Sequence, residues 1–394
     1  MKARVLAVVM AGGAGTRLAP LTDRRPKPAV PYAGVYRMID FPLSNCAHSG
    51  IDDVWVVQQF HPHPLGEHLA GGRPWDLDRT RGGLQVLFPH LGDEESGWHQ
   101  GNGDAIYRNR SLVRRCDPDV VVVLSADHVY RLDYGVVVDT HLDRGAELTM
   151  VTTVLPREEV GRFGNVEVDG EGRVQRFRYK PDDPLSDVVT TEVFVFDADA
   201  LLAAVEELAG SGDNDGLDDL GDQLIPHFVE RGGVWSHRMD GYWRDVGTVA
   251  SYWCSHLDLL GPDPAFTLDD PRWPILTAAV QRSPARLCGT ATVDDALVAP
   301  GCTVGGEVVR SVLGPGVVVE EGATVRSSIL LDGTVVHAGA TVSGAICDAG
   351  SRIGARAAVG RLDAPGADDV VVVGEGVEVA EGSEVPAGAR LAPP

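Results

Sequence analysis

The chain uses arginine for nearly all of its positive charges, which makes its few lysines informative. Lys and Arg together number 34, and only Lys2, Lys27 and Lys180 are lysines. A lysine ammonium is a compact point charge, whereas a guanidinium is a planar fork of donors. Lys27 and Lys180, which each precede a proline, are therefore candidates for sites that need an ammonium. Chance placement is the alternative for either lysine taken alone.

A glycine-rich segment before Lys27 has the composition of an anion-binding loop. It reads Ala-Gly-Gly-Ala-Gly-Thr-Arg-Leu over residues 11–18. It lacks the Gly-Lys-Ser/Thr ending of a P-loop and does not complete the spacing of a dinucleotide-binding loop. Its glycines let backbone N–H groups approach an anion closely, and Thr16 and Arg17 add a hydroxyl and a charge. A glycine-rich turn without a ligand is the alternative.

The elements that must position these residues alternate between strand-like and helix-like patterns over the first 250 residues. Helical patterns cover Gly103–Arg115 and Ala198–Leu208. Apolar runs typical of buried strands are Val5–Met10, Asp53–Val57, Val120–Leu124, Leu148–Val154 and Glu192–Phe196. The alternation predicts an α/β domain with a Rossmann-like, mostly parallel sheet. Ligands of such sheets bind beyond the carboxyl ends of the strands, which points to the residues after Met10 and Leu124.

A repeat of 17 residues replaces this alternation from about residue 290. It aligns three apolar columns, Val312/Ile329/Ile346, Val319/Val336/Ile353 and Val325/Val342/Val359, and two glycine columns, Gly305/Gly322/Gly339 and Gly316/Gly333/Gly350. Each unit holds three short strands and tight turns, which predicts a parallel β-helix. We expect the apolar columns to stack inside the coil and the glycines to lie at turns. Asp363–Asp369 interrupts the repeat, and Val370–Leu391 adds a partial coil.

These patterns and the composition limit what the chain can be. We expect a first domain over residues 1–260, a proline-rich linker over 261–290 and the β-helix over 291–394. The formal net charge of −23 argues against nucleic acid or an anionic membrane surface as a partner. No apolar run approaches the ~18–20 residues of a transmembrane helix. Six scattered cysteines argue against a zinc knuckle or a disulfide framework, so we expect a cytoplasmic protein with reduced thiols.

Several motifs, taken together, resemble those of the sugar-nucleotide pyrophosphorylases, and most closely the ADP-glucose pyrophosphorylase family. The matching segments are residues 6–18, Arg25–Pro31, Met38–Cys46, Ser125–Tyr130, Tyr242–Thr248 and Arg272–Ile275. The resemblance runs essentially from end to end. It implies a nucleotidyltransferase domain followed by a left-handed β-helix, and it predicts a homo-oligomer, a tetramer or a dimer. Residues 291–394 contain six Arg and fourteen Asp or Glu, a net charge of 6 − 14 = −8. Since a sugar-phosphate activator would need a basic cleft, we expect effector control to be weak or absent.

The reaction implied by the resemblance joins a sugar 1-phosphate to an NTP and releases pyrophosphate and an NDP-sugar. Such a transfer depends on positioning and charge neutralisation more than on a general base. By resemblance, Asp127 and Asp245 hold Mg²⁺, and Arg17, Lys27 and Asp127 are the catalytic residues. The implied nucleotide-binding residues are Ala11, Gly12, Gly13, Gly15, Thr16, Arg17, Gly101 and Asp104. The implied sugar-phosphate-binding residues are Tyr179, Lys180, Thr190 and Glu192.

The departures from the family pattern lie around the two substrates. Tyr179 stands where the family has a glutamate before the sugar-phosphate lysine, and Glu192 stands where it has a glycine. A Gln-Gln pair that meets the nucleobase in the family is missing, and Phe88–Gly92 occupies its region. Drift in an ordinary glucose-1-phosphate adenylyltransferase is one explanation. The other is a changed substrate, such as a carbasugar, valienol-type cyclitol 1-phosphate, with ATP or GTP as the donor.

Two other classes of protein share parts of this pattern. Hexapeptide acyltransferases also contain a β-helix, but they need a histidine base reached through a protruding loop, whereas His337 lies within an uninterrupted coil. A non-catalytic regulatory paralogue would be expected to lose a carboxylate or a lysine first, and this chain retains all of them. Both classes are weaker explanations than a sugar-1-phosphate nucleotidyltransferase.

Overall fold

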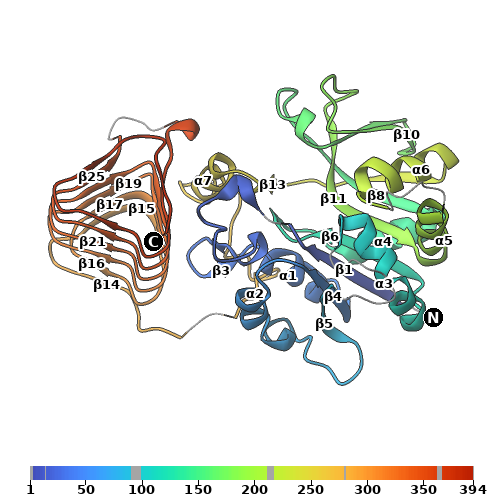
Figure 1. The fold of residues 1–394 in the computed structure, drawn as a ribbon, viewed down its shortest axis with the longest axis horizontal. Coiled ribbons are helices and arrows are strands. Elements are labelled where there is room, and N and C mark those ends of the chain that lie inside the picture. Colours follow the sequence, from blue (N-terminus) through green and yellow to red (C-terminus); the bar gives the residue numbers. More distant parts are fainter. Residues whose placement is uncertain are drawn as a thin grey trace.

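The computed structural model describes residues 3–13, 15–89, 99–210, 217–278, 281–361 and 366–393. An α/β domain, which ends with helix α7 (Val249–Leu257), lies beside a β-helix that begins with β14 (Arg286–Leu287) (Figure 1). Within the described residues, no helix is both long enough and apolar enough to cross a membrane.

The α/β domain is built on a nine-stranded sheet whose central part is parallel. The parallel strands lie in the order β6-β1-β4-β5, and β11 extends the sheet antiparallel to β6. The strands of this sheet are β1 (Val5–Ala11), β4 (Asp53–Gln58), β5 (Gly83–Leu87), β6 (Val120–Ser125), β8 (Leu148–Val154), β9 (Gly164–Val168), β10 (Val174–Tyr179), β11 (Val188–Asp197) and β12 (Val234–Arg238). The five predicted strands are confirmed, and β11 is longer than its apolar run indicated.

Helices cover both faces of the sheet because the central strands are apolar on both sides. Leu6 and Val8 of β1 pack in one buried cluster, whereas Ala7 and Val9 pack in another. Helices α3, α5 and α6 contribute to the first cluster, and α1, α2 and α4 contribute to the second. Their bounds are α1 (Asp40–His48), α2 (Pro62–Leu69), α3 (Asn102–Cys116), α4 (Tyr134–Arg144), α5 (Ala198–Gly210) and α6 (Ile225–Arg231). Both predicted helices are confirmed, as α3 and α5.

Two small antiparallel ribbons complete the domain. One joins β2 (Pro31–Tyr32) to β3 (Tyr36–Arg37). The other joins β7 (His128–Tyr130) to β13 (Trp243–Asp245) and pairs Asp245 with His128. Since β7 begins directly after Asp127, this second ribbon carries the two candidate metal ligands to the same place.

The β-helix follows the predicted repeat. Val318, Val335 and Arg352 are paired in parallel at intervals of 17 residues, and the next interval, from Arg352 to Glu378, contains the interruption. Part of that interruption lies outside the described residues. The strands after β14 are β15 (Thr292–Val298), β16 (Thr303–Val304), β17 (Glu307–Leu313), β18 (Val318–Val319), β19 (Thr324–Arg326), β20 (Ile329–Leu330), β21 (Val335–Val336), β22 (Thr341–Ser343), β23 (Ala345–Cys347), β24 (Arg352–Ile353), β25 (Ala358–Gly360), β26 (Val371–Val373), β27 (Glu378–Val379), β28 (Glu384–Val385) and β29 (Arg390–Leu391).

Two of the three apolar columns stack inside the coil, and the prediction for the third column is wrong. The columns that begin at Val319 and Val325 belong to the interior cluster. Ile329 and Ile346 instead belong to a cluster shared with the α/β domain, and their neighbours Leu330 and Cys347 fill the interior. Successive strand residues point to opposite faces, so this column forms an apolar outer face of the β-helix.

That outer face packs against the α/β domain. The shared cluster includes Tyr32, Phe41 and Tyr252 from the first domain. The indole N–H of Trp253 on α7 also donates a hydrogen bond of 2.7 Å to the carbonyl of Ser327. The two domains are therefore joined by a continuous buried core.

Candidate active site

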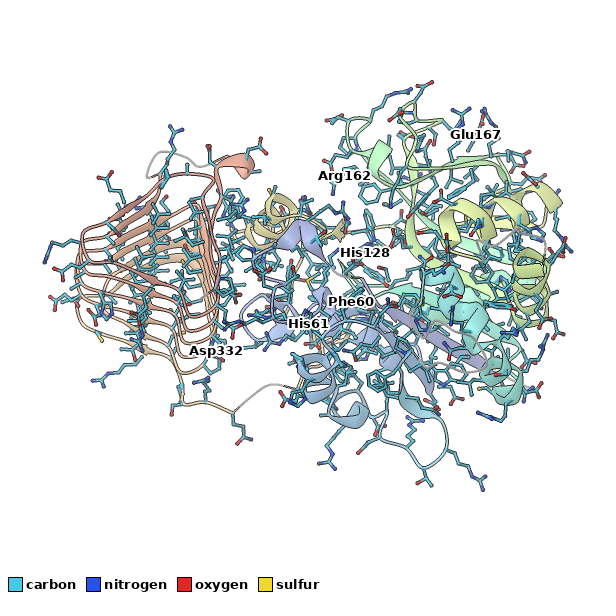
Figure 2. All side chains as sticks on the ribbon, in the orientation of Figure 1. Phe60, His61, His128, Arg162, Glu167 and Asp332 are labelled. Carbon is cyan, nitrogen blue, oxygen red and sulfur yellow. The ribbon has the colours of Figure 1, made fainter. Side chains whose placement is uncertain are left out.

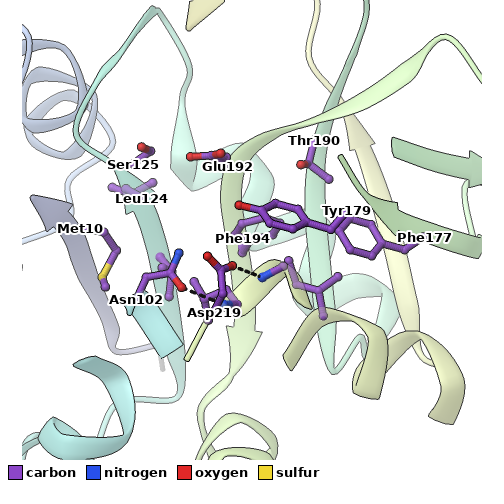
Figure 3. Close-up of a pocket in the computed structure, with 14 residues that line it drawn as sticks. Met10, Asn102, Leu124, Ser125, Phe177, Tyr179, Thr190, Glu192, Phe194 and Asp219 are labelled. Carbon is purple, nitrogen blue, oxygen red and sulfur yellow. Dashed lines mark hydrogen bonds between the residues drawn. The ribbon is translucent and has the colours of Figure 1, made fainter. Parts of the chain in front are cut away.

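Two adjoining cavities lie at the carboxyl ends of β1, β4 and β6, where the sequence pattern places a ligand. Both cavities are lined by Met10, Asn102, Ser125 and Asp219, so they form one cleft. The larger cavity, of about 1040 Å³, also borders Gly12, Gly13, Lys27 and Asp127. The smaller cavity, of about 470 Å³, contains Tyr179, Thr190 and Glu192 and is shown in Figure 3.

Lys27 joins the two candidate metal ligands in this cleft. Its ammonium donates a hydrogen bond to the Asp127 carboxylate and lies 3.4 Å from Oδ1 of Asp245. Only 8% of the Lys27 side chain is exposed. Burial opposes its charge, but the two carboxylates more than compensate and raise the pKa of Lys27. Although burial opposes ionisation of Asp127, Lys27 and His128 hold its pKa well below the usual range.

His128 lies at the centre of these acidic groups, a position that was not foreseen. Its Nε2 atom is 3.4 Å from Asp127, 3.7 Å from Asp245 and 3.8 Å from Glu192. Its Nδ1 atom is 3.1 Å from the carbonyl of Thr191. In Figure 2, His128 lies between Arg162 and Phe60. The signal for this residue was its place directly after Asp127 in a family-matching motif.

The donor set at the end of the β7–β13 ribbon is suited to a hard divalent cation. One potential ligand atom from each of Asp127, His128 and Asp245 lies within 4.8 Å of the other two. Carboxylate oxygens are the ligands that Mg²⁺ prefers in proteins. Arg162 approaches from the outer side, with Nη2 3.3 Å from Asp245. The residues present therefore fit the predicted metal.

Two residues of the glycine-rich loop border the same cavity as Lys27 and Asp127. Ala11 ends β1, and Gly12 and Gly13 border the larger cavity. Gly15 has φ +68°, and a Cβ there would lie 3.0 Å from the Thr22 side chain and 3.2 Å from Lys27 Cβ. Only glycine permits both this backbone conformation and this approach.

The two polar residues after the glycines begin a 3₁₀ turn, Thr16–Leu18, and both are exposed. A Cβ placed on Gly247 would lie 3.3 Å from Arg17 Nη2. Gly247 follows Asp245 by two residues. Arg17 therefore lies close to the turn that carries Asp245, although it is not among the described residues that line the two cavities. Thr16 is not among the described residues that line the two cavities.

The start of α3 closes the cleft from another side. Gly101 precedes the helix, and a Cβ there would clash with the carbonyl of Asp218. Asp104 accepts hydrogen bonds from the Gln100 N–H and from Arg108, and it is absent from the described residues that line the cleft. The structure thus brings Gly101 to the cleft and turns the Asp104 carboxylate into the helix start.

Tyr179 and Lys180 lie at the end of β10. The Tyr179 ring packs so closely on Gly221 that a Cβ at that glycine would lie 2.5 Å from the ring. The exposed Lys180 has φ +44° and donates a hydrogen bond of 2.7 Å to the Tyr179 hydroxyl. Burial raises the pKa of the Tyr179 hydroxyl, and the negative charge of Asp219 adds to this rise.

Glu192 is placed in the cleft by an irregularity in β11. Its φ of +55° lies in the left-handed region, and the register between β11 and β8 shifts between Thr190 and Phe194. Limited solvation raises the pKa of the Glu192 carboxyl; His128 opposes this rise, and Asp127 and Asp245 add to it. A non-glycine residue in this conformation is strained and marks a candidate functional position.

The sequence did not single out several other residues that the structure brings to the cleft. Gln59, Phe60, His99 and Gln100 line the larger cavity, and Asp219 borders both cavities. The side-chain amide of Gln59 donates a 3.1 Å hydrogen bond to the His99 carbonyl. The strand-end rule could have identified Gln59, which follows β4, whereas no local pattern marks Asp219. In the segment predicted to replace the Gln-Gln pair, residues 90–92 lie outside the described residues.

Comparisons with known proteins agree with this geometry. The nucleotidyl transferase family model matches residues 6–261, and a model of GlmU-like C-terminal hexapeptide repeats matches residues 283–385. A glucose-1-phosphate adenylyltransferase of Thermotoga neapolitana is 42% identical over 324 residues, which cover 82% of this chain and 76% of the relative. The enzyme of the same name from Clostridium acetobutylicum is 39% identical over 81% of this chain and 83% of its own length.

Proposed function

Because the chain belongs to the glucose-1-phosphate adenylyltransferase family of nucleotidyl transferases, we propose that it transfers a nucleotidyl group from an NTP to the 1-phosphate of a sugar or a sugar-like ring. We also propose that Tyr179 and Glu192 give it a different preference for that ring than the family pattern has. It is a sugar-1-phosphate nucleotidyltransferase, and the proposal assigns its site residues, its sugar and its base. The observation that carries the proposal is the contact of the buried Lys27 with the half-buried Asp127 and Asp245, beside a cavity that Gly12 and Gly13 of the glycine-rich loop also border.

Charge neutralisation is the main role that we assign to this group. Asp127 and Asp245 would hold Mg²⁺, which when bound neutralises phosphate charge and orients the triphosphate. Lys27 keeps its proton because it is flanked by both carboxylates, so it can stabilise charge on the departing pyrophosphate. Arg17 and the N–H groups of the glycine-rich loop bind the triphosphate from the opposite side. No general base is needed, because the attacking group is already an anion.

Lys180 is the residue that we assign to the phosphate of the ring 1-phosphate. Its ammonium is exposed, and it lies beside the smaller cavity through its contact with the Tyr179 hydroxyl. Asp219 and Glu192 line that cavity and provide carboxylate acceptors. This arrangement suits a polyhydroxylated ring with its phosphate toward Lys180 and its hydroxyls toward the two carboxylates.

Glu192 favours a ring other than ordinary glucose. A glutamate at a position with left-handed backbone is strained, and a glycine there would not be. Each hydrogen bond from a ring hydroxyl to a carboxylate contributes roughly 1.5–3 kcal/mol. A modified sugar 1-phosphate or a valienol-type cyclitol 1-phosphate that makes such bonds is the substrate we propose. Glucose 1-phosphate is the alternative, favoured by the names of the relatives.

The nucleobase is assigned to the larger cavity, near Gln59 and Gln100. These side chains offer amide donors and acceptors at the end of β4 and before α3. The names of the relatives specify adenylyl transfer, so we propose ATP as the donor. GTP is the alternative, because amide side chains can hydrogen-bond either purine.

The test is a matrix of ATP, GTP and UTP against glucose, modified-sugar and cyclitol 1-phosphates, measured as pyrophosphate release with Mg²⁺. Glu192→Gly should weaken use of the native ring 1-phosphate roughly tenfold or more and leave glucose 1-phosphate nearly unaffected. Glu167→Gly, an exposed change on β9, is the control. Unchanged kcat/KM ratios in Glu192→Gly would leave glucose 1-phosphate as the substrate, and no pyrophosphate from any pair would contradict the function.

A further inference from the structure

Arg25, two residues before Lys27, is held by the β-helix. Its guanidinium donates two hydrogen bonds of 3.0 Å to the two carboxylate oxygens of Asp348 and one of 2.9 Å to Glu375. Arg25 is 8% exposed and Asp348 is completely buried. The contact joins the segment before Lys27 to the C-terminal coils; in Figure 1 the blue segment near β3 lies beside the β-helix. A buried ion pair thus links the loop before Lys27 to the other domain.

The two carboxylates are themselves rigidly placed. Asp348 follows β23 and Glu375 follows β26 by two residues, and these strands pair in parallel. Oδ1 of Asp348 also accepts a 2.7 Å hydrogen bond from the Ala349 N–H. A bidentate arginine–carboxylate pair fixes direction as well as distance. The corner of the β-helix therefore determines where the Arg25 guanidinium lies.

The position of Arg25 is passed to Lys27 through a short, hydrogen-bonded turn. The Ala29 N–H donates to the Pro26 carbonyl at 2.9 Å, and the Val30 N–H donates to the Lys27 carbonyl at 3.0 Å. On the other side of this turn, a Cβ placed on Gly15 of the glycine-rich loop would lie 3.2 Å from Lys27 Cβ, so the loop backbone runs close to Lys27. The backbone of Lys27 thus lies between the ion pair of Arg25 with Asp348 and the glycine-rich loop.

We propose that Arg25 is a positioning residue, through whose ion pair with Asp348 the β-helix fixes the turn that presents Lys27 to the reacting phosphates. This inference rests on the function proposed above for Lys27. Arg25 is not among the described residues that line the cleft, so its effect passes through Lys27. A group that acts in the transition state must be placed within a fraction of an ångström. Loosening the pair should therefore lower kcat and leave both KM values nearly unchanged.

The test uses the full-length protein with the two most buried charges removed, as Arg25→Met with Asp348→Leu, and keeps Glu375, whose side chain is 35% exposed. Removing one partner would leave a buried, uncompensated charge, whereas replacing both by apolar groups is often tolerated. The double variant should fold, as judged by circular dichroism and a cooperative thermal transition. Its kcat should fall about tenfold or more, with each KM within about threefold of wild type. Arg25→Lys, which keeps the charge and loses the bidentate geometry, should show an intermediate fall.

A second arginine–aspartate pair provides the control. Arg282 in the linker donates to both oxygens of Asp332 on the β-helix, at 2.9 and 3.1 Å. Arg282→Met with Asp332→Leu should change kcat by less than about twofold, because neither residue belongs to the turn of Lys27. A wild-type kcat in the folded Arg25/Asp348 variant, or an equal loss in the control pair, would overturn the inference. If the Arg25/Asp348 variant does not fold, a wild-type kcat in Arg25→Lys would overturn it.

If the proposed function itself were wrong, the wild-type protein, and not only the Arg25 variants, would give the contradicting result. In that case the wild-type protein releases no pyrophosphate with any NTP and ring 1-phosphate tested. An active wild-type protein whose rate is insensitive to the Arg25 pair contradicts only the positioning role.

Discussion

At the scale of single residues, Asp127 is a carboxylate whose ionised form is strongly stabilised by its neighbours. It accepts hydrogen bonds from Lys27 and from the Ser125 hydroxyl, and its pKa is held low by Lys27 and His128 despite burial. Asp127→Asn removes this charge while preserving shape. We expect turnover to fall about a hundredfold or more, because the Mg²⁺ that would neutralise phosphate charge loses one of its two carboxylate ligands. Pyrophosphate release at saturating substrates and Mg²⁺ measures the effect.

The matched control for that variant is Asp133→Asn. Asp133 caps α4 by accepting a hydrogen bond from the Gly135 N–H at 2.8 Å, and asparagine caps helices equally well. Its turnover should stay within about twofold of wild type. Near-normal turnover in Asp127→Asn would remove Asp127 from the mechanism.

The two lysines should differ in the kinetic constant that they affect. Lys27 is buried between two carboxylates, so Lys27→Arg forces a larger fork into a closed site and should mainly lower kcat. Lys180 is exposed, so Lys180→Arg should mainly raise KM for the ring 1-phosphate. Steady-state kinetics with each substrate varied in turn separates the two effects. The same defect in both variants would show that the roles are assigned wrongly.

At the scale of elements, β11 carries a strained residue in the cleft. A left-handed conformation costs a non-glycine residue roughly 1–2 kcal/mol, and Glu192 has φ +55°. Glu192→Gly should therefore leave the free energy of unfolding unchanged or raise it by up to about 1 kcal/mol, although glycine makes the unfolded chain more flexible. Urea denaturation measures this. Glu167→Gly within β9 should instead lower it by about 1 kcal/mol, and an equal loss in both variants would argue against strain at Glu192.

Helix α7 carries a histidine that should make stability depend on pH. The ring of His256 is completely buried, with Nδ1 2.8 Å from the Tyr252 carbonyl and Nε2 accepting the Ala33 N–H at 3.0 Å. Burial lowers the pKa of His256 from 6.5 to about 4. Its neutral form is thus favoured by folding, so its contribution is complete above pH 6.5 and is lost as the pH falls from 6.5 toward 4.

The change between pH 7 and pH 5 from this one group should be about 2 kcal/mol in the free energy of unfolding. Urea denaturation at both pH values should show a smaller loss in His256→Gln than in wild type, because glutamine does not titrate. His63→Gln, a change at an exposed side chain, should lose as much as wild type. Equal losses in His256→Gln and wild type would contradict the assignment.

At the scale of the whole molecule, an apolar face of the β-helix is part of the core of the other domain. Ile346 is completely buried and belongs to the cluster that includes Tyr32 and Tyr252. Ile346→Ala should lower the free energy of unfolding by about 2–4 kcal/mol, as for a core residue. Differential scanning calorimetry measures the change. Leu287→Ala, at a largely exposed side chain on β14, should change it by less than about 0.5 kcal/mol. Equal stability of Ile346→Ala and wild type would show that this face contributes little.

The sequence by itself determined the order of the elements, the repeat and the composition of the glycine-rich loop. These are local properties: an apolar run that leads into glycines, or a 17-residue period, is visible without knowing what packs against it. Asp127 could be placed at the end of a strand for the same reason. Lys27 and Lys180 could be singled out because the chain has so few lysines.

Only the tertiary structure decided which way the repeat faces and which distant groups meet. The period aligns Val312, Ile329 and Ile346 in a column, but it does not show whether the column faces the inside or the outside of the coil, because a shift of one residue exchanges the two faces of a strand. Ile329 and Ile346 face outward because the α/β domain packs against them. The group around His128 and the contact of Arg25 with Asp348 join segments far apart in the chain. No local pattern encodes such contacts, because they depend on how the ribbons and coils pack together.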